Sequence, residues 1–331
     1  MALSAARLAT MAEETGFRAE TLERVIRLGE ILTEIGRHPF LSRVLALKGG
    51  TDLNLCFGSP SRLSVDLDLN YIGRLERDGM IEDRDEIQAV IQRLASALGY
   101  RLQWSRNEHA GRKAFLGFVG AAGTPGRIEV DLNFLFRLPL GQVRRMTMWQ
   151  PADQPRPAVK VVSPEELASG NLCALLSRAL PRDLFDARAL PEKMPGVWGE
   201  LRFRRLFVAF AGVLDHPLHA YGRSRFDRVT DRAVREQLHP MLLQHDRPAA
   251  AGLREDAWAV IAPLLDLDDA AREYTDRLQA GELHPQLLFP DDADLASQVA
   301  RHPALLWKAQ NAREHAAKGA RPGPKRSSTS S

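Results

Sequence analysis

The stretch VLALKGGTDLNLCFGSPSRLSVDLDLNYIG, Val44–Gly73, decides the fold. It opens with a short apolar run, Val44–Leu47, that predicts a buried strand. Two adjacent glycines break the run, and the residues after Thr51 are compatible with a helix. The second half, Arg62–Tyr71, alternates polar and apolar side chains, as a strand with one buried face does. The stretch therefore predicts a strand, a Gly-Gly turn, a short helix and a half-buried strand.

The polar face of the second predicted strand carries two carboxylates. Asp66 and Asp68 are two residues apart, so both point the same way from backbone positions roughly 6.6 Å apart. Such a pair is also common on exposed strand edges. Here a further predicted strand, Arg127–Phe134, places Asp131 on its own polar face. Close carboxylates repel each other and divalent cations remove that cost, so the three aspartates predict a two-metal site for phosphoryl or nucleotidyl transfer.

The Lys48-Gly49-Gly50-Thr51 turn has the parts of a phosphate-binding site. It offers backbone amides without covering side chains, a hydroxyl at a helix N-terminus and a nearby cation. A turn that merely needs positive φ would explain one glycine readily and two less well. The spacing is not that of a G-x-x-x-x-G-K-[ST] P-loop.

The remaining elements follow from hydrophobic periodicity and from helix start signals. Helices are expected over residues 20–35 and 87–98, and strands over 100–105, 113–119 and 127–134. Ser163 and Pro164 begin a helix to about Arg178, and Pro181 begins another. From Trp198 to Gln310 the period is helical nearly throughout, which predicts a helical second domain.

The amino-acid composition excludes few classes of protein. The chain has 331 residues, 44% of them hydrophobic and 26% charged, which is ordinary for a globular protein with room for two domains. Its net charge is +3, but residues 311–331 alone carry +4, so the basic excess belongs to the tail and does not argue for a nucleic-acid partner. Cys56 and Cys173 lack paired spacing, and no signal-peptide core or membrane-spanning run is visible. We expect a cytoplasmic protein without membrane association.

Four motifs in the same order resemble the AbiEii/AbiGii nucleotidyltransferase family. They are L-K-G-G-T-x-L, R-x-S-x-D-x-D-L, I-x-V-D-x-N, and E-E-L followed by P-R-D-L-x-D, within roughly residues 40–190. This family belongs to the DNA polymerase β-like nucleotidyltransferase superfamily and contains the toxins of type IV toxin–antitoxin and phage abortive-infection systems. The resemblance implies an α/β nucleotidyltransferase domain with a mixed α+β sheet, followed by an all-helical domain.

The expected domain boundaries follow from these motifs and from the composition. We expect a helical lead-in over residues 1–38, the nucleotidyltransferase domain over 39–190, a helical C-terminal domain over 191–312 and a disordered basic tail over 313–331.

The resemblance also implies roles for individual residues. Asp66, Asp68 and Asp131 would be catalytic and would bind the metal ions, Mg²⁺ or Mn²⁺, with Asp131 as candidate general base. The residues expected to bind the nucleotide are Lys48, Gly49, Gly50, Thr51, Arg62, Ser64 and Asp183. The sequence departs from the family at Asn171, where a lysine usually faces the triphosphate. Absence of this lysine would weaken nucleotide binding, or Lys48, Lys160 or Arg178 would contact the triphosphate in its place, or the enzyme has lost its activity.

The implied reaction is transfer of a nucleoside monophosphate from an NTP to an RNA acceptor, with the tRNA 3′ end favoured and a cognate antitoxin encoded nearby. Two alternatives stay open: a nucleotidyltransferase acting on a small molecule or protein, and a catalytically silent nucleotide- or RNA-binding module. Residues 199–235 hold eight arginines against four acidic residues. That stretch is either a set of solvated helix faces or an RNA-binding surface.

Overall fold

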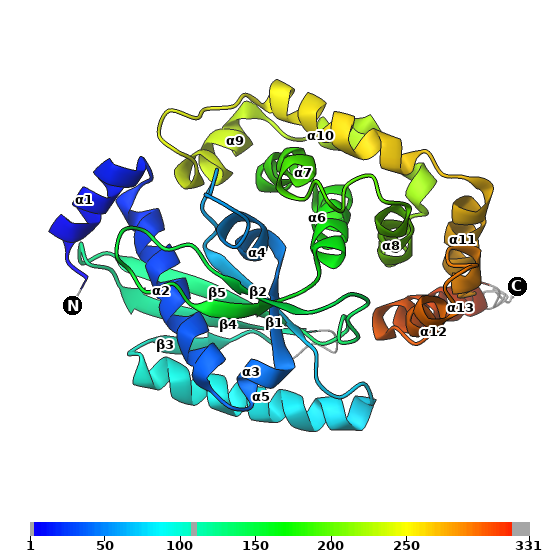
Figure 1. The fold of residues 1–331 in the computed structure, drawn as a ribbon, viewed down its shortest axis with the longest axis horizontal. Helices are drawn as coiled ribbons and strands as arrows, with labels where there is room; N and C mark the ends of the chain where they lie inside the picture. Colours follow the sequence, from blue (N-terminus) through cyan, green and yellow to red (C-terminus); the bar gives the residue numbers. More distant parts are fainter. Residues whose placement is uncertain (1–2, 107–110, 320–331) are drawn as a thin grey trace, which may run out of the picture.

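A seven-stranded mixed sheet organises the first half of the chain (Figure 1). The structure is a computed structural model and describes residues 3–106 and 111–319. Within them the strand order is β3-β4-β5-β2-β1-β7-β6, with β2 parallel to β5 and antiparallel to β1. The strands are β1 Leu45–Lys48, β2 Asp66–Tyr71, β3 Arg101–Trp104, β4 Gly111–Val119, β5 Pro125–Asn133, β6 Arg144–Thr147 and β7 Ala158–Val161.

The helices of the N-terminal half lie on both faces of the sheet. They are α1 Ala5–Thr15, α2 Ala19–Arg37, α3 Leu41–Val44, α4 Gly49–Leu55 and α5 Arg77–Ala97. The α2 and α5 helices cover one face, and α4 lies on the other (Figure 1). Strand alternation separates the two faces: Leu45 and Leu47 enter a core with α2 and α5, whereas Ala46 enters a second core. The polar row of β2 therefore faces away from α2 and α5.

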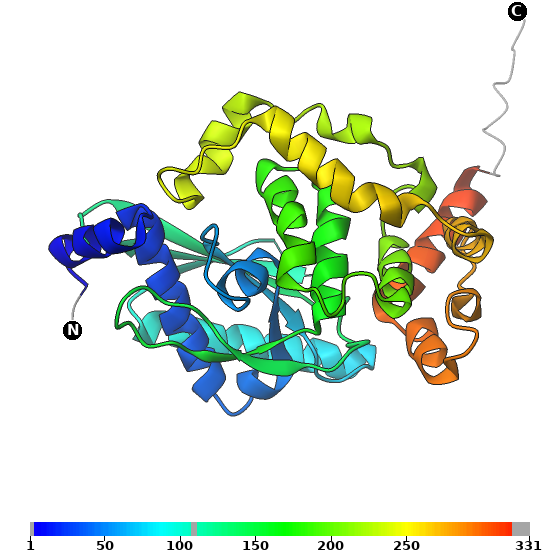
Figure 2. The ribbon, with the colours of Figure 1, turned by 45° about the horizontal axis from the view of Figure 1, so that its top comes forward.

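The second core is helical. It is built from α6 Pro164–Arg178, α7 Pro181–Lys193, α8 Leu201–Ala211, α9 Asp231–Gln237, α10 Ala250–Leu265, α11 Asp269–Gln279, α12 Ala293–Ala300 and α13 Pro303–Gly319, with 3-10 turns at Leu218–Ala220, Arg223–Phe226, His239–Met241 and Pro285–Leu287. In Figure 2 the α10 helix passes across α7, and the two helices are in contact. The α6 and α7 helices thus join the expected nucleotidyltransferase region to the helical half.

Local signals place the helix ends where the sequence predicts them. The Ser163 side chain accepts a hydrogen bond from the backbone amide of Glu166, and Pro164 fills the first turn of α6. At the start of α7 the Asp183 carboxylate accepts the backbone amide of Leu180. The helical character predicted after Trp198 is confirmed, as is the mixed sheet. Among the described residues no helix is long and apolar enough to cross a membrane.

Three expectations need correction. The strand predicted from Arg62 begins only at Asp66, because the preceding segment pairs with the helical half instead: the Leu63 amide donates to the carbonyl of Met241. The strands β6 and β7 were not predicted; β6 is mostly exposed and does not alternate between buried and exposed residues as a half-buried strand does. The α13 helix extends to Gly319, so residues 313–319 of the expected disordered tail are helical, and residues 320–331 lie outside the described part.

Candidate active site

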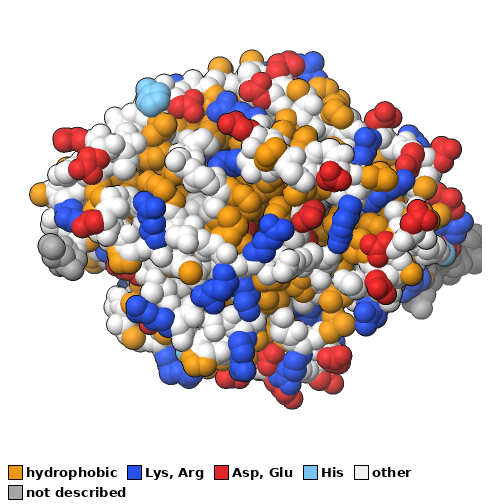
Figure 3. All heavy atoms as spheres, in the orientation of Figure 1, with side chains coloured by type: hydrophobic (Ala, Val, Ile, Leu, Met, Phe, Trp, Pro, Cys, Tyr) orange, Lys and Arg blue, Asp and Glu red, His pale blue; other side chains and the backbone are white. Residues whose placement is uncertain are grey.

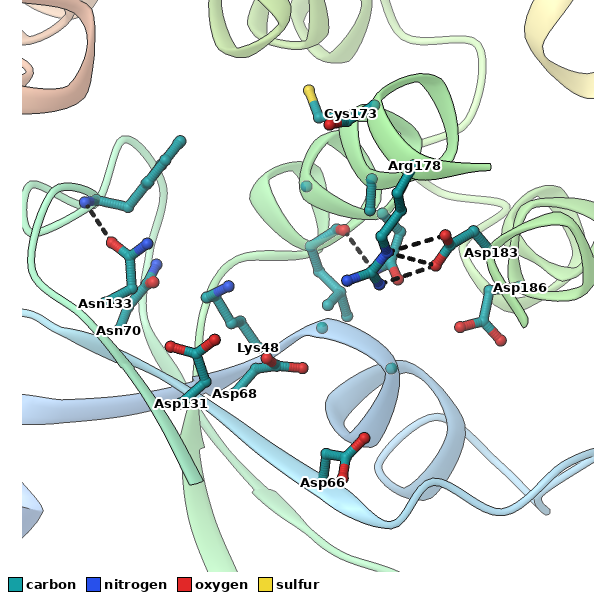
Figure 4. A pocket seen from close by; sticks show the side chains of 18 of the residues that line it. Lys48, Asp66, Asp68, Asn70, Asp131, Asn133, Cys173, Arg178, Asp183 and Asp186 are labelled. Carbon is teal, nitrogen blue, oxygen red and sulfur yellow. Dashed lines mark hydrogen bonds and ion pairs between the residues drawn. The ribbon is translucent and has the colours of Figure 1, made fainter. Parts of the chain in front are cut away.

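A cavity of about 370 Å³ lies between the polar face of the sheet and helices α6, α7 and α8. Nine of the ten residues predicted from sequence line it: Lys48, Gly49, Gly50, Arg62, Ser64, Asp66, Asp68, Asp131 and Asp183. Figure 4 shows the labelled side chains turned toward this space from β1, β2, β5, α6 and α7. Segments more than one hundred residues apart in the chain therefore build a single site.

The register of β2 and β5 sets the spacing of the acidic groups. Asp68 lies directly opposite Asp131, and Asp66 lies opposite Glu129. On the other side of β2, Lys48 of β1 is the partner of Asp68. Four carboxylates thus stand on two neighbouring strands with a lysine beside them. Glu129 was not singled out from the sequence, although it lies two residues before Asp131 and therefore on the same face of β5.

Burial raises the pKa of Asp66, with the nearby Arg182 opposing this rise and the charge of Asp68 adding to it. Burial likewise raises the pKa of Asp131, opposed by Lys113 and reinforced by Asp68. The ion pairs are direct: Arg182 Nη1 is 3.2 Å from Asp66 Oδ2, and Lys113 Nζ is 3.5 Å from Asp131 Oδ2. Two cations that sequence reasoning missed therefore balance part of the acidic charge.

The donor set suits a divalent metal ion, because carboxylate oxygens on adjacent strands are hard ligands of the kind that Mg²⁺ and Mn²⁺ prefer. Asp68 and Asp131 are strand partners and both line the cavity. In the part of the chain that the structure describes, however, no group of three or more His, Cys, Asp or Glu side chains is arranged to hold a metal ion. The predicted set of Asp66, Asp68 and Asp131 is therefore present as neighbours without forming a ready three-carboxylate cluster.

A side chain at either glycine of the turn would crowd a charged neighbour. Gly49 has φ +68°, and a Cβ on it would lie 2.6 Å from Asp68 Oδ2. A Cβ on Gly50 would lie 2.7 Å from an Arg62 nitrogen. Positive φ explains only the first glycine, whereas the crowding of charged side chains against the turn explains both. The turn thus brings backbone directly against the acidic row.

Thr51 is the predicted residue that does not line the cavity. Its side chain is fully buried, and its hydroxyl is hydrogen-bonded to Ser64 Oγ at 2.8 Å and to the backbone carbonyl of Asp66. Thr51 therefore ties α4 to the start of β2 from behind the cavity wall. Ser64 remains on the cavity side of this contact.

Arg62 is held by a buried partner that was not assigned a role from the sequence. Both Arg62 and Asp186 are almost fully buried, and Arg62 Nε donates to Asp186 Oδ1 at 2.6 Å. Asp186 also accepts the amide of Asn54, whose side chain in addition donates to the carbonyl of Gly50. This network fixes the glycine turn, α4 and α7 relative to one another.

Arg178 is oriented by Asp183. Its Nε and Nη2 donate to the buried Asp183 carboxylate at 2.8–3.2 Å, while the Arg178 side chain is half exposed on the cavity side. Asn171 also lines the cavity, but its amide donates to the carbonyl of Leu167 within its own helix. Lys160 does not line the cavity, and its ammonium group donates a hydrogen bond to the carbonyl of Arg43. Of the three cations considered as substitutes for the usual lysine, Lys48 and Arg178 therefore line the cavity.

Part of the cavity lining is apolar. The rings of Phe136 and Phe210 are stacked, with centroids 5.7 Å apart and planes at 22°. Other apolar lining residues are Val162, Leu167, Ala174, Val213 and Leu214. The part of the lining that holds Lys48, the glycine turn and Arg178 is the charged end of the cavity, and Phe136 with Phe210 of α8 forms an aromatic wall.

The arginine-rich stretch is largely used within the protein. Seven of its eight arginines donate to carboxylates or carbonyls of the chain itself: Arg202, Arg204, Arg205, Arg223, Arg225, Arg228 and Arg232. Figure 3 shows Lys and Arg side chains spread among acidic and apolar ones over the visible face. This stretch therefore gives no specific support for an RNA-binding surface.

Comparisons with known proteins identify the family of the chain. Residues 30–278 match the family model described as nucleotidyl transferase AbiEii toxin, type IV TA system. Among solved structures the chain is similar to MenT4, a nucleotidyltransferase toxin from Mycobacterium tuberculosis H37Rv, with a TM-score of 0.62 and 16% identity over 90% of this chain and 99% of that one. No curated protein sequence matches. The family model spans three quarters of the chain, and on that ground the protein belongs to the AbiEii nucleotidyltransferase toxins of type IV toxin–antitoxin systems.

Proposed function

We propose that the protein transfers a nucleoside monophosphate from an NTP to an RNA acceptor, with the 3′ end of tRNA as the favoured acceptor. The observation that carries this proposal is the pairing of Asp68 with Asp131 beside the glycine turn in one cavity. The acceptor hydroxyl would form a new bond to the α-phosphorus, and the bond between the α-phosphorus and the bridging oxygen would break. Pyrophosphate then leaves.

The chain's own residues divide this work. The Gly49 and Gly50 backbone and the Lys48 and Arg178 side chains would hold the triphosphate, since all four line the charged end of the cavity. Asp131 is the candidate to accept the proton of the acceptor hydroxyl. Thr51 and Asp186 would act indirectly, by fixing α4 and Arg62.

A divalent metal ion, which we propose to be Mg²⁺ with Mn²⁺ as a possible substitute, would be held by Asp66, Asp68 and Asp131. It would supply charge neutralisation at the triphosphate and a lower pKa of the attacking hydroxyl.

We propose that the reaction takes place in the cytoplasm, where the free thiols Cys56 and Cys173 suit a reducing environment. Family membership implies an antitoxin partner, and modified tRNA would block translation.

The test is incubation of the purified protein with total tRNA, Mg²⁺ and each α-labelled NTP in turn. Asp68→Asn, which keeps the shape of the side chain and removes its charge, is run alongside. We expect label in tRNA only with the native protein, and a loss of at least about a hundredfold in the variant. Label in protein or a small molecule but not in RNA would select the alternative acceptors. NTP binding without pyrophosphate release in any metal would identify a silent binding module.

A further inference from the structure

Asn70 stands out among the cavity residues that the proposed chemistry leaves unused. It lies on the same face of β2 as Asp66 and Asp68, one side-chain position farther along the strand, and it lines the cavity. Its side chain is only 6% exposed, and its Oδ1 has no hydrogen-bond partner among the described residues. A buried amide oxygen left without a hydrogen-bond partner destabilises a folded protein. Such a group is typical of a position that pairs with a ligand.

Its strand partner, Asn133, behaves differently. The Asn133 Oδ1 accepts the backbone amides of Leu135 and Phe136 at 3.0 and 2.9 Å. Asn133 therefore holds the backbone of Phe136, whose ring lines the cavity and stacks on Phe210. Of two asparagines that face each other across β2 and β5, one is occupied in building the aromatic wall and the other is left with an unpaired oxygen beside it.

Asn70 and Asn133 lie on the opposite side of the paired aspartates from α7. Figure 4 shows Asn70 and Asn133 on one side of Asp68 and Asp131, with Asp183 and Asp186 on the other side. The glycine turn and Arg178 belong to the charged end, where the proposed function places the phosphates. A nucleotide whose phosphates lie at that end has its nucleoside on the far side of the acidic row. There it meets an amide and an aromatic wall.

We propose that Asn70 hydrogen-bonds the edge of a nucleobase and is a specificity-determining residue of this enzyme, an inference that rests on the proposed nucleotidyl transfer. An asparagine amide presents one acceptor and one donor side by side, which matches the adjacent donor and acceptor groups on base edges. The wall formed by Phe136 offers a surface on which the base stacks. The base belongs to the incoming NTP or to the last nucleoside of the acceptor.

The test measures how strongly the protein prefers one nucleobase over another. Affinities for ATP, GTP, CTP and UTP are determined by calorimetry for the native protein, Asn70→Ala and Asn70→Ser, and kcat/KM is determined for acceptors that differ only in the last base. Asn311→Ala on α13, outside the cavity lining, is the matched control. Loss of the base contact is expected to reduce the ratio between best and worst base by about tenfold. If the ratio of NTP affinities falls, Asn70 contacts the base of the incoming NTP. If instead the ratio of kcat/KM values between acceptors falls, Asn70 contacts the last base of the acceptor.

Three results would overturn the inference. The first is that both ratios stay unchanged in Asn70→Ala and Asn70→Ser. The second is an equal loss for all bases with a higher metal requirement, which would make Asn70 a metal ligand. The third is a fall in melting temperature of more than a few degrees in both variants, with preference retained, which would make its role structural. NTP affinities are measured without an acceptor, so a wrong choice of acceptor would leave this test readable.

Discussion

At the scale of single residues, the guanidinium of Arg178 is the cation whose geometry is best defined at the charged end of the cavity. Asp183 fixes its plane through three hydrogen-bond contacts, which leaves the remaining donors available to the cavity. Arg178→Lys keeps the charge but loses the planar fork, so we expect KM for the NTP to rise about tenfold with little change in kcat. Arg178→Gln should raise KM further. Steady-state kinetics check this, and an unchanged KM in the glutamine variant would remove Arg178 from the nucleotide site.

Asp52 in α4 gives a prediction about pH. Its side chain is fully buried, and burial raises its pKa well above the usual value. Between the unfolded pKa of about 3.9 and that raised value, the folded state holds a proton that the unfolded state has lost, so its contribution to stability falls as pH rises. Asp52→Asn removes this dependence.

We expect Asp52→Asn to be more stable than the native protein by at least about 1 kcal/mol at pH 8, with the difference vanishing near pH 4. Urea unfolding at both pH values measures the difference, in which the contributions of all other carboxylates cancel. A stability difference independent of pH would show that Asp52 is ionised in the fold.

At the scale of elements, the buried pair of Arg62 and Asp186 joins the segment before β2 to α7. Both side chains are at most 4% exposed, so Asp186→Asn leaves a buried guanidinium without its counter-charge. Loss of one partner of a buried pair typically costs about 3–5 kcal/mol. The matched control is Glu255→Gln, which breaks the exposed pair with Arg223 and should cost less than about 1 kcal/mol. Urea denaturation compares them, and equal small losses would contradict the assigned role.

The same pair explains what the sequence could and could not predict about elements. The period-two pattern of β2 and β5 is local, so it predicted the row of Asp66, Asp68 and Asp131 correctly. The extent of β2 depended on contacts that the preceding segment makes more than one hundred residues later, from Leu63 to Met241 and from Arg62 to Asp186, which no local pattern encodes. Likewise Lys113 and Arg182 reach the aspartates only through tertiary packing.

At the scale of the whole molecule, the cavity joins two hydrophobic cores. The sheet core carries Lys48, Asp68 and Asp131, whereas Arg178 and Asp183 belong to helices of the second core. Hydrophobic periodicity predicted both halves, because each is built from regular amphipathic elements. It did not predict that α6 and α7 pack with the helical half while lining the site, since apolar faces do not specify their partners.

This arrangement predicts that nucleotide binding couples the two cores. An NTP that contacts groups from both stabilises the native state by about 2.7 kcal/mol at one hundred times its Kd. We expect saturating NTP with a divalent metal to raise the melting temperature by several degrees and to sharpen unfolding into one transition, measured by differential scanning calorimetry. In Asp68→Asn the metal-dependent part of the shift should disappear, because the carboxylate that pairs with Asp131 is gone. If nucleotide stabilised only one of two transitions while turnover persisted, the triphosphate would contact a single core, and the assignment of Lys48 and Arg178 to one phosphate site would be wrong.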